Sequence, residues 1–192
     1  MMNAVLIGSS DRSSLWRYGQ IKKEEYEQFV REYAKFLSER FDNLIVTPDD
    51  GVYTDIALEY GKIMNKKPIA FYPDKDTQYG IDNLRKNFAL YEVKAIDGDW
   101  YRLNAELTKQ SLTVIVLGFT PSSLIELGFI KYHQKYGGLK DPELKKIHVF
   151  IDERCITEKL PKTFEEQIDN IFYYSDLDQL DKLIKRRARF FK

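Results

Sequence analysis

The sequence predicts an α/β protein in which a mostly parallel sheet is covered by helices on both faces, giving a sandwich of three layers. Short apolar runs rich in β-branched residues alternate with longer segments whose apolar residues recur at helical spacing. This alternation is typical of repeated strand–helix units. The chain has 192 residues and shows no internal repeat, low-complexity tract or shift in composition, so residues 1–192 are expected to form a single domain.

Seven strands are predicted from apolar runs that end at glycine, proline or polar residues. The first is the run Ala-Val-Leu-Ile before Gly8, and the fifth is broken only by Thr113 and ends at Gly118. Runs this short with this many β-branched residues are typical of strands buried on both faces. The predicted strands are residues 4–7, 43–47, 69–72, 93–96, 112–117, 147–151 and 171–174.

Helices are predicted between these strands from apolar residues at helical spacing. The helix after the fifth strand has Thr120 as its expected N-cap, Pro121 at its first position, and Gly137 and Gly138 as its expected C-cap. Residues 73–80 are the most loop-like segment and a candidate lid or linker. The other predicted helices are residues 22–40, 52–64, 81–90, 99–110, 164–170 and 177–191.

Composition narrows the functional classes. Lysine plus arginine equals aspartate plus glutamate, at 30 each, so the overall charge gives no case for nucleic acid binding. The lone cysteine, Cys155, cannot form an internal disulfide, and no run approaches the roughly 18 apolar residues of a membrane span. No cysteine or histidine spacing suggests zinc. We therefore expect a cytoplasmic protein without membrane or nucleic acid partners, and neither a metal nor another cofactor.

The loops after the first, second and fifth predicted strands are candidate ligand sites. Parallel sheets bind ligands outside the carboxyl ends of their strands, where the winding of the chain reverses. The loop after the first strand contains Gly8, Ser9 and Ser10, whose small size and hydroxyls suit a phosphate, with Arg12 available if it points inward. An ordinary polar surface loop explains these residues equally well.

The loop after the second strand is Pro48-Asp49-Asp50-Gly51. Its two carboxylates would repel phosphate. We favour the interpretation that one aspartate caps the next helix, which explains the segment without any ligand. If the loop is functional, Asp49 or Asp50 accepts hydrogen bonds from ribose hydroxyls or a base, and Asp55 could join them.

The third loop opens the helix that contains Ser122, Ser123 and Glu126. Helical spacing places these three side chains on the N-terminal face of that helix. A carboxylate among Leu124, Ile125 and Leu127 is costly to bury without a partner. Glu126 is therefore a candidate functional residue, with an exposed edge of the helix as the alternative.

This succession of motifs resembles the SLOG superfamily, and within it the lysine-decarboxylase-like proteins that include cytokinin-activating phosphoribohydrolases. In that group a first strand ends in Gly-Ser-Ser, here residues 8–10, and a second ends in Gly-Gly-Gly, matched in position by residues 48–51. An arginine, here Arg102, lies on the helix before a strand that ends in Pro-Gly-Gly-x-Gly-Thr-x-x-Glu, matched by residues 118–126. Leu103 stands where the family has a lysine, and both glycine-rich turns are largely replaced.

The resemblance covers residues 4–150 in element order and implies a Rossmann-like nucleotide-binding domain. Its members cleave a base from a nucleoside 5′-monophosphate with that arginine and glutamate around the ribose, which gives catalytic roles to Arg102 and Glu126. The stretch Glu126-Leu127-Gly128-Phe129 is also similar to nucleoside 2-deoxyribosyltransferases, in which the glutamate is the nucleophile. The candidate phosphate or ribose contacts are Gly8, Ser9, Ser10, Asp49, Asp50, Gly118, Ser122 and Ser123.

Three hypotheses follow. The first is an enzyme acting on an N-glycosidic bond of a nucleotide or nucleoside, with Glu126 at the anomeric carbon. The second is a nucleotide-sensing module that kept the cleft and lost catalysis. The third is a structural protein. Under each of them the apolar helix at residues 121–133 is expected to form a homodimer surface.

Overall fold

All seven strands of the structure join in one parallel sheet, as predicted. The computed structural model describes residues 2–75 and 85–189, with side chains to residue 186. The strand order is β4-β3-β2-β1-β5-β6-β7, and every strand pair is parallel. The strands are β1 (Asn3–Gly8), β2 (Asn43–Val46), β3 (Ile69–Pro73), β4 (Glu92–Ile96), β5 (Thr113–Leu117), β6 (His148–Asp152) and β7 (Ile171–Tyr174).

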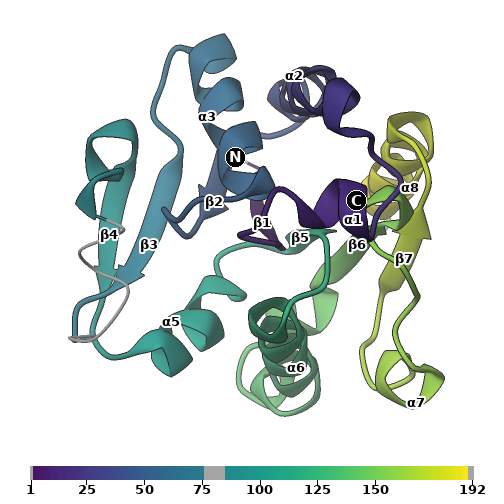
Figure 1. Ribbon diagram of the computed structural model, residues 1–192. Coiled ribbons are helices and arrows are strands. Elements are labelled where there is room, and N and C mark those ends of the chain that lie inside the picture. The colour runs from purple at the N-terminus through teal and green to yellow at the C-terminus, as the bar shows by residue number, and fades with distance from the viewer. Residues whose placement is uncertain (1, 76–84, 190–192) are drawn as a thin grey trace.

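Helices cover both faces of this sheet, which confirms the predicted three layers. Figure 1 shows α2, α3 and α8 on one face and α5, α6 and α7 on the other. The α-helices are α1 (Ser14–Arg17), α2 (Tyr26–Ser38), α3 (Val52–Met64), α5 (Trp100–Leu107), α6 (Pro121–Lys135), α7 (Lys162–Glu165) and α8 (Leu177–Arg189). Short 3₁₀ turns are η1 (Lys23–Glu25), η2 (Phe88–Leu90), η3 (Gly137–Leu139), η4 (Pro142–Lys146) and η5 (Glu153–Cys155).

Alternation along each strand divides the hydrophobic core in two. In β1, Ala4 and Leu6 pack under α2 and α3, whereas Val5 and Ile7 face α5 and α6. Every residue of β5 is buried, as expected of a central strand covered on both sides. None of the helices in the described part of the chain is long and apolar enough to cross a membrane.

Several predicted boundaries are wrong. Helix α2 begins at Tyr26 rather than at residue 22, because the 3₁₀ turn η1 precedes it. Helix α7 spans Lys162–Glu165 rather than residues 164–170, and α1 lies in a segment that we expected to be a loop. Residues 76–84, which include most of the candidate lid and the first part of the helix predicted at residues 81–90, lie outside the described residues.

The predicted glycine C-cap of α6 is also wrong. Gly137 and Gly138 do not adopt the left-handed conformation of a C-cap but continue the chain into the turn η3. Their small size serves packing instead, since a Cβ on Gly137 would lie 2.8 Å from Leu144 Cδ1 and one on Gly138 would lie 2.4 Å from Lys145 Cγ. The two glycines therefore let η4 pack closely against the end of the helix.

The switch point of the sheet lies between β1 and β5. From β1 the chain winds outward through β2, β3 and β4, and it then returns to β5 on the other side. The loops after β1 and β5 consequently diverge and leave space at the carboxyl ends of the central strands. The structure thus places the predicted site region at this edge of the sheet.

Candidate functional site

A cleft of about 240 Å³ lies at the carboxyl ends of β1 and β2. It is bounded by the first turns of α3 and α6 and by one side of α5. The loops after the first and second strands therefore converge with α6, as the sequence predicted. The lining residues are Leu6, Ile7, Gly8, Thr47, Asp49, Tyr53, Trp100, Asn104, Ser122, Ile125 and Glu126.

Glu126 is buried at the wall of this cleft rather than at an exposed edge of α6. Glu126 is only 6% exposed, because helical spacing places it on the same inward face as Ser123 and Leu127. Within the described residues, no side chain or backbone group makes a hydrogen bond or ion pair with its carboxyl. Burial, reinforced by the negative charge of Asp49, raises the pKa of Glu126 to about 8. At neutral pH this carboxyl is therefore predominantly protonated.

Asp49 faces the same cleft from the loop after β2. It accepts a hydrogen bond from the Tyr53 hydroxyl one helical turn further on, while its Oδ1 is fully enclosed without a hydrogen-bond partner among the described residues. Burial raises the pKa of Asp49 to about 7, and the Tyr53 hydrogen bond partly offsets that effect. The aspartates do not cap α3, whose N-cap is Gly51, so the favoured capping interpretation of this loop is wrong.

Together the half-buried Asp49 and the buried Glu126 form a pair of carboxyls that line one small cavity. The charge of Asp49 contributes to the raised pKa of Glu126, so ionisation of one group disfavours ionisation of the other. Near neutral pH the pair holds about one proton, which leaves one carboxyl able to donate and one able to accept. This is the combination that general acid–base catalysis requires.

Helix α6 begins as the sequence predicted, but its first turn is closed by its own side chains. Thr120 Oγ1 accepts from the Ser123 backbone N–H at 3.2 Å, and Ser123 Oγ accepts from the Thr120 N–H at 2.7 Å. Ser123 is completely buried and makes no contact with the cleft, whereas Ser122 lines it. Gly118 lies behind this turn, where its carbonyl accepts from the Ser123 hydroxyl at 3.3 Å.

The loop after β1 is closed in the same way. Ser9 Oγ donates to the Asp11 carbonyl and accepts from the Asp11 N–H, and the Ser9 N–H donates to the Leu117 carbonyl of β5. Ser9 is thus buried in internal hydrogen bonds, and Ser10 is exposed without lining the cleft. Of the predicted trio, only Gly8 reaches the cleft. A Cβ there would lie 2.5 Å from the Leu117 carbonyl oxygen, so the close approach of β1 and β5 requires glycine.

Three charged residues that the sequence suggested for the site, Arg12, Asp50 and Asp55, form ion pairs outside the cleft. Asp50 is exposed and accepts a hydrogen bond from Lys86 at 2.8 Å, so it turns away from the cleft. Arg12 makes a two-point ion pair with Asp55, in which Nη2 lies 2.6 Å from Oδ1. Asp55 also accepts from the Tyr26 hydroxyl, so this network ties the β1 loop to α3 and α2.

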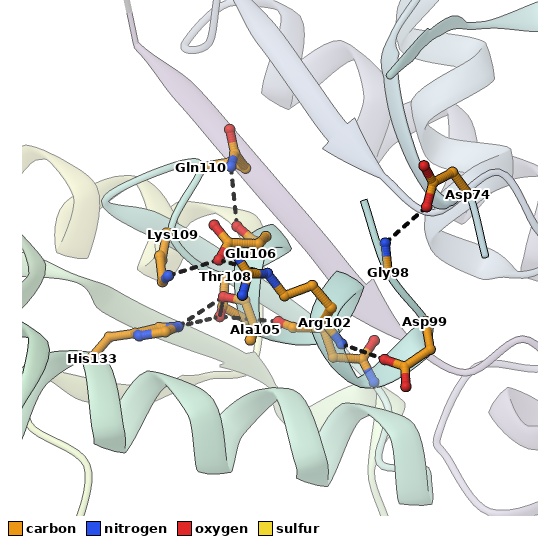
Figure 2. Close-up of polar contacts among 11 residues, drawn as sticks. Asp74, Gly98, Asp99, Arg102, Ala105, Glu106, Thr108, Lys109, Gln110 and His133 are labelled. Atoms are coloured by element: carbon orange, nitrogen blue, oxygen red, sulfur yellow. Dashed lines mark hydrogen bonds and ion pairs between the residues drawn. The ribbon is translucent and has the colours of Figure 1, made fainter. Parts of the chain in front are cut away.

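Arg102 is not brought to the cleft. Its side chain is 63% exposed and lies along α5 towards Glu106, with Nε 3.5 Å from Oε1 (Figure 2). The Arg102 backbone N–H donates to Asp99 Oδ1 at 3.0 Å, which makes Asp99 the N-cap of α5. Helix α5 instead presents Trp100 and Asn104 to the cleft.

Four polar or aromatic lining residues were missed by sequence reasoning: Thr47, Tyr53, Trp100 and Asn104. Tyr53 had a usable signal, because its position four residues after Asp49 lets its hydroxyl reach back to that carboxyl. Trp100 and Asn104 reach the cleft because α5 packs beside α6, and no local sequence pattern indicated that packing.

A larger hollow of about 890 Å³ lies on the outer side of α2 and α3. It is wide open, and some of the charged side chains along it pair with one another or with their own helix, such as Lys62 with Glu59 at 2.7 Å. It lies away from the switch point of the sheet and contains no carboxyl with an unsatisfied buried oxygen. We therefore take the smaller cleft as the candidate site.

No protein-family model and no curated protein matches the chain. Solved structures do match. A protein designated TM1055 is 13% identical with a TM-score of 0.64, over 97% of this chain and 99% of that one. The molybdenum cofactor carrier protein of Chlamydomonas reinhardtii is 14% identical with a TM-score of 0.59, over 98% of each chain.

DNA processing protein A of Helicobacter pylori, which binds single-stranded DNA, is also similar. It is 13% identical to this chain with a TM-score of 0.57, over 96% of this chain and 81% of that one. At such low identity, these likenesses concern the fold and not the ligand or the reaction. The chain has the same Rossmann-like α/β fold as these structures.

Proposed function

We propose that the cleft binds the sugar of a nucleoside or nucleotide and that the Asp49–Glu126 pair cleaves its N-glycosidic bond. The observation that carries this proposal is the pair itself: two carboxyls from different elements line one cavity, and both have a pKa raised towards neutrality. Enzymes that cleave glycosidic bonds commonly use two carboxyl groups, one protonated and one ionised.

The protonated state of Glu126 suits it to the role of general acid rather than nucleophile. Glu126 gives its proton to the nitrogen of the leaving base, which takes the electron pair of the breaking C1′–N bond. The Asp49 carboxylate stabilises the positive charge that develops on the sugar. A water molecule then forms the new bond to C1′ and passes a proton to Asp49, so the pair again holds one proton.

The fold supports a ligand at this position, because parallel α/β sheets bind ligands at the switch point. Two of the similar structures belong to proteins described as a cofactor carrier and a single-stranded DNA binder, so this fold serves ligand binding in both. The remaining lining groups suit a sugar and a base, since Asn104, Thr47 and Ser122 offer hydrogen bonds and Trp100 offers a flat apolar surface.

The test combines binding with product detection. A panel of nucleosides and nucleotides is screened by thermal shift, and the same mixtures are analysed by chromatography for free base. We expect at least one compound both to raise the melting temperature and to release its base. Absence of any shift and of any free base across the panel would refute the proposal.

A second candidate function is binding without catalysis. It is favoured by the internally capped first turn of α6, which offers fewer groups to a ligand than an open glycine-rich turn would. A compound that shifts the melting temperature but releases no base would support this function. The likeness to a single-stranded DNA binder makes an oligonucleotide a necessary member of the panel, although charge alone argued against nucleic acid.

We also propose that the outer face of α6 packs against a second copy of this chain. This face consists of Ile125, Gly128, Tyr132 and Tyr136, and its three large side chains are 48%, 56% and 55% exposed. Gly128 has open space around its Cβ position, so nothing inside the chain requires a glycine there. A glycine within a helix costs roughly 0.5–1 kcal/mol relative to alanine. Close crossing of two copies of α6 at this point would explain it.

Replacing Tyr132 by glutamate should convert the dimer to a monomer, because the change places a charge within the buried contact. Light scattering after size-exclusion chromatography measures the mass directly. The matched control is Tyr18→Glu, which alters a similarly exposed tyrosine at the end of α1. A wild-type protein that is monomeric at high micromolar concentration would contradict the proposal.

A further inference from the structure

The parts of this fold that would hold a phosphate are closed by the chain's own hydrogen bonds. At the start of α6, the Thr120 and Ser123 N–H groups are satisfied by each other's side chains, and the Leu124 N–H donates to the Thr120 carbonyl at 3.0 Å. A helix N-terminus attracts an anion through N–H groups that have no partner within the helix. In α6 the first position is Pro121, which has no N–H, and the Ser123 N–H is capped by Thr120, so of the first three positions only Ser122 keeps an N–H for a ligand.

The start of α3 is partly closed in the same way. The Gly51 N–H donates to Thr54 Oγ1 at 2.8 Å, and the Val52 N–H donates to the Ser9 carbonyl at 3.4 Å. The β1 loop contributes nothing further, because Ser9 uses its hydroxyl and its N–H on Asp11 and Leu117. The three loops that meet at the cleft therefore offer few donors to a phosphate group.

The charges at the cleft also oppose an anion. Its ionisable lining groups are Asp49, Glu126 and the Tyr53 phenol, and no lysine or arginine lines it among the residues that the structure describes. Two cations near Asp49 have carboxylate partners of their own: Arg12, whose charge acts on Asp49, pairs with Asp55, and Lys86 pairs with Asp50. A phosphate dianion would meet like charge without compensation.

The size and walls of the cleft point to a small neutral group. Its volume of about 240 Å³ lies below the roughly 300–1,000 Å³ typical of pockets that enclose drug-sized ligands, so it suits one ring rather than a whole nucleotide. Asp49 and Glu126 both line the cleft, and their carboxyl groups can exchange hydrogen bonds with sugar hydroxyls.

We propose that this cleft selects ligands without phosphate, and that its substrate is a neutral nucleoside or a related N-glycoside rather than a nucleoside 5′-monophosphate. The proposal rests on the function proposed above and narrows its substrate class. Selection operates through repulsion of the phosphate by the carboxyl pair and through the small number of free hydrogen-bond donors at these turns. The preference for a nucleoside over its 5′-monophosphate should grow as pH rises, because the Asp49–Glu126 pair then carries more negative charge.

The test compares each of the four common ribonucleosides with its own 5′-monophosphate. Dissociation constants are measured by calorimetry at pH 6 and pH 8, and free base is measured separately by chromatography. We expect the nucleoside of at least one matched pair to bind about tenfold or more tightly than its monophosphate, as like-charge repulsion at close range produces. The ratio of the monophosphate's dissociation constant to that of the nucleoside should be larger at pH 8 than at pH 6.

The variant Asp49→Asn removes one of the two charges and should reduce the ratio at pH 8, whereas Glu24→Gln, an exposed acid-to-amide change far from the cleft, should leave it unchanged. Equal or tighter binding of the monophosphate overturns the inference, even if base is released and the proposed function stands. Nucleoside selectivity without base release supports the inference and overturns the catalytic proposal. Failure of all eight compounds to bind overturns both.

Discussion

Replacing Glu126 by glutamine should reduce N-glycosidic cleavage by about 10²–10⁴-fold, the usual contribution of a general acid. Glutamine has nearly the same shape but no acidic proton, so the leaving base would depart unprotonated. The loss should appear mainly in kcat, because proton transfer occurs in the transition state rather than in ground-state binding. Steady-state assays of base release measure kcat and KM separately.

The matched control for this variant is Asp50→Asn. It makes the same carboxyl-to-amide change beside the cleft, but at an exposed side chain that pairs with Lys86. It should retain activity, whereas Asp49→Asn should lose it. Full activity in Glu126→Gln, or equal losses at positions 49 and 50, would contradict the assignment of the acid–base pair.

The two carboxyls should also make the protein less stable as pH rises. Burial raises the pKa of Glu126 from 4.5 to about 8 and that of Asp49 from 3.8 to about 7. A raised folded-state pKa means that the folded protein holds protons that the unfolded chain has released. The contribution to stability is therefore complete below pH 4 and is lost as pH rises towards 8. Each such group gives a slope of up to about 1.4 kcal/mol per pH unit.

The variant Glu126→Gln isolates this effect, because glutamine stays neutral at every pH. Its free energy of unfolding should match that of the wild type near pH 4 and exceed it at pH 8 by on the order of 4 kcal/mol. Denaturant titrations at several pH values measure both proteins. Burial lowers the pKa of His133, so this residue destabilises both proteins at acid pH. Its effect therefore cancels from the difference between their free energies of unfolding. A difference that does not change with pH would rule out a buried, protonated Glu126.

The strands and the three layers were predictable because buried strands leave a local pattern in the sequence. Central strands such as β1 and β5 are covered on both faces and therefore appear as nearly continuous apolar runs. Thr120 and Pro121 marked the start of α6 for an equally local reason. The four-residue helix α1 was not predictable, because it is too short to show any periodicity.

The site was predictable only where helix geometry decides it. Glu126 shares the inward face of α6 with Leu127, so its burial follows from the sequence. Its pairing with Asp49 depends on the packing of two distant segments, and a capped helix start explained Asp49 equally well beforehand. The resemblance pointed to Arg102, but the spacing of α5 turns that side chain towards Glu106 and solvent.

The proposed mechanism depends on a protonated Glu126 at neutral pH, which carbon NMR of the side-chain carboxyls can measure. The Glu126 resonance is identified by its absence from the Glu126→Gln spectrum, and its chemical shift is followed from pH 3 to pH 10. A midpoint of about 8 is expected, with the Asp49 carboxyl titrating at about 7. A Glu126 midpoint near the ordinary value of 4.5 would contradict both the buried acid and the mechanism built on it.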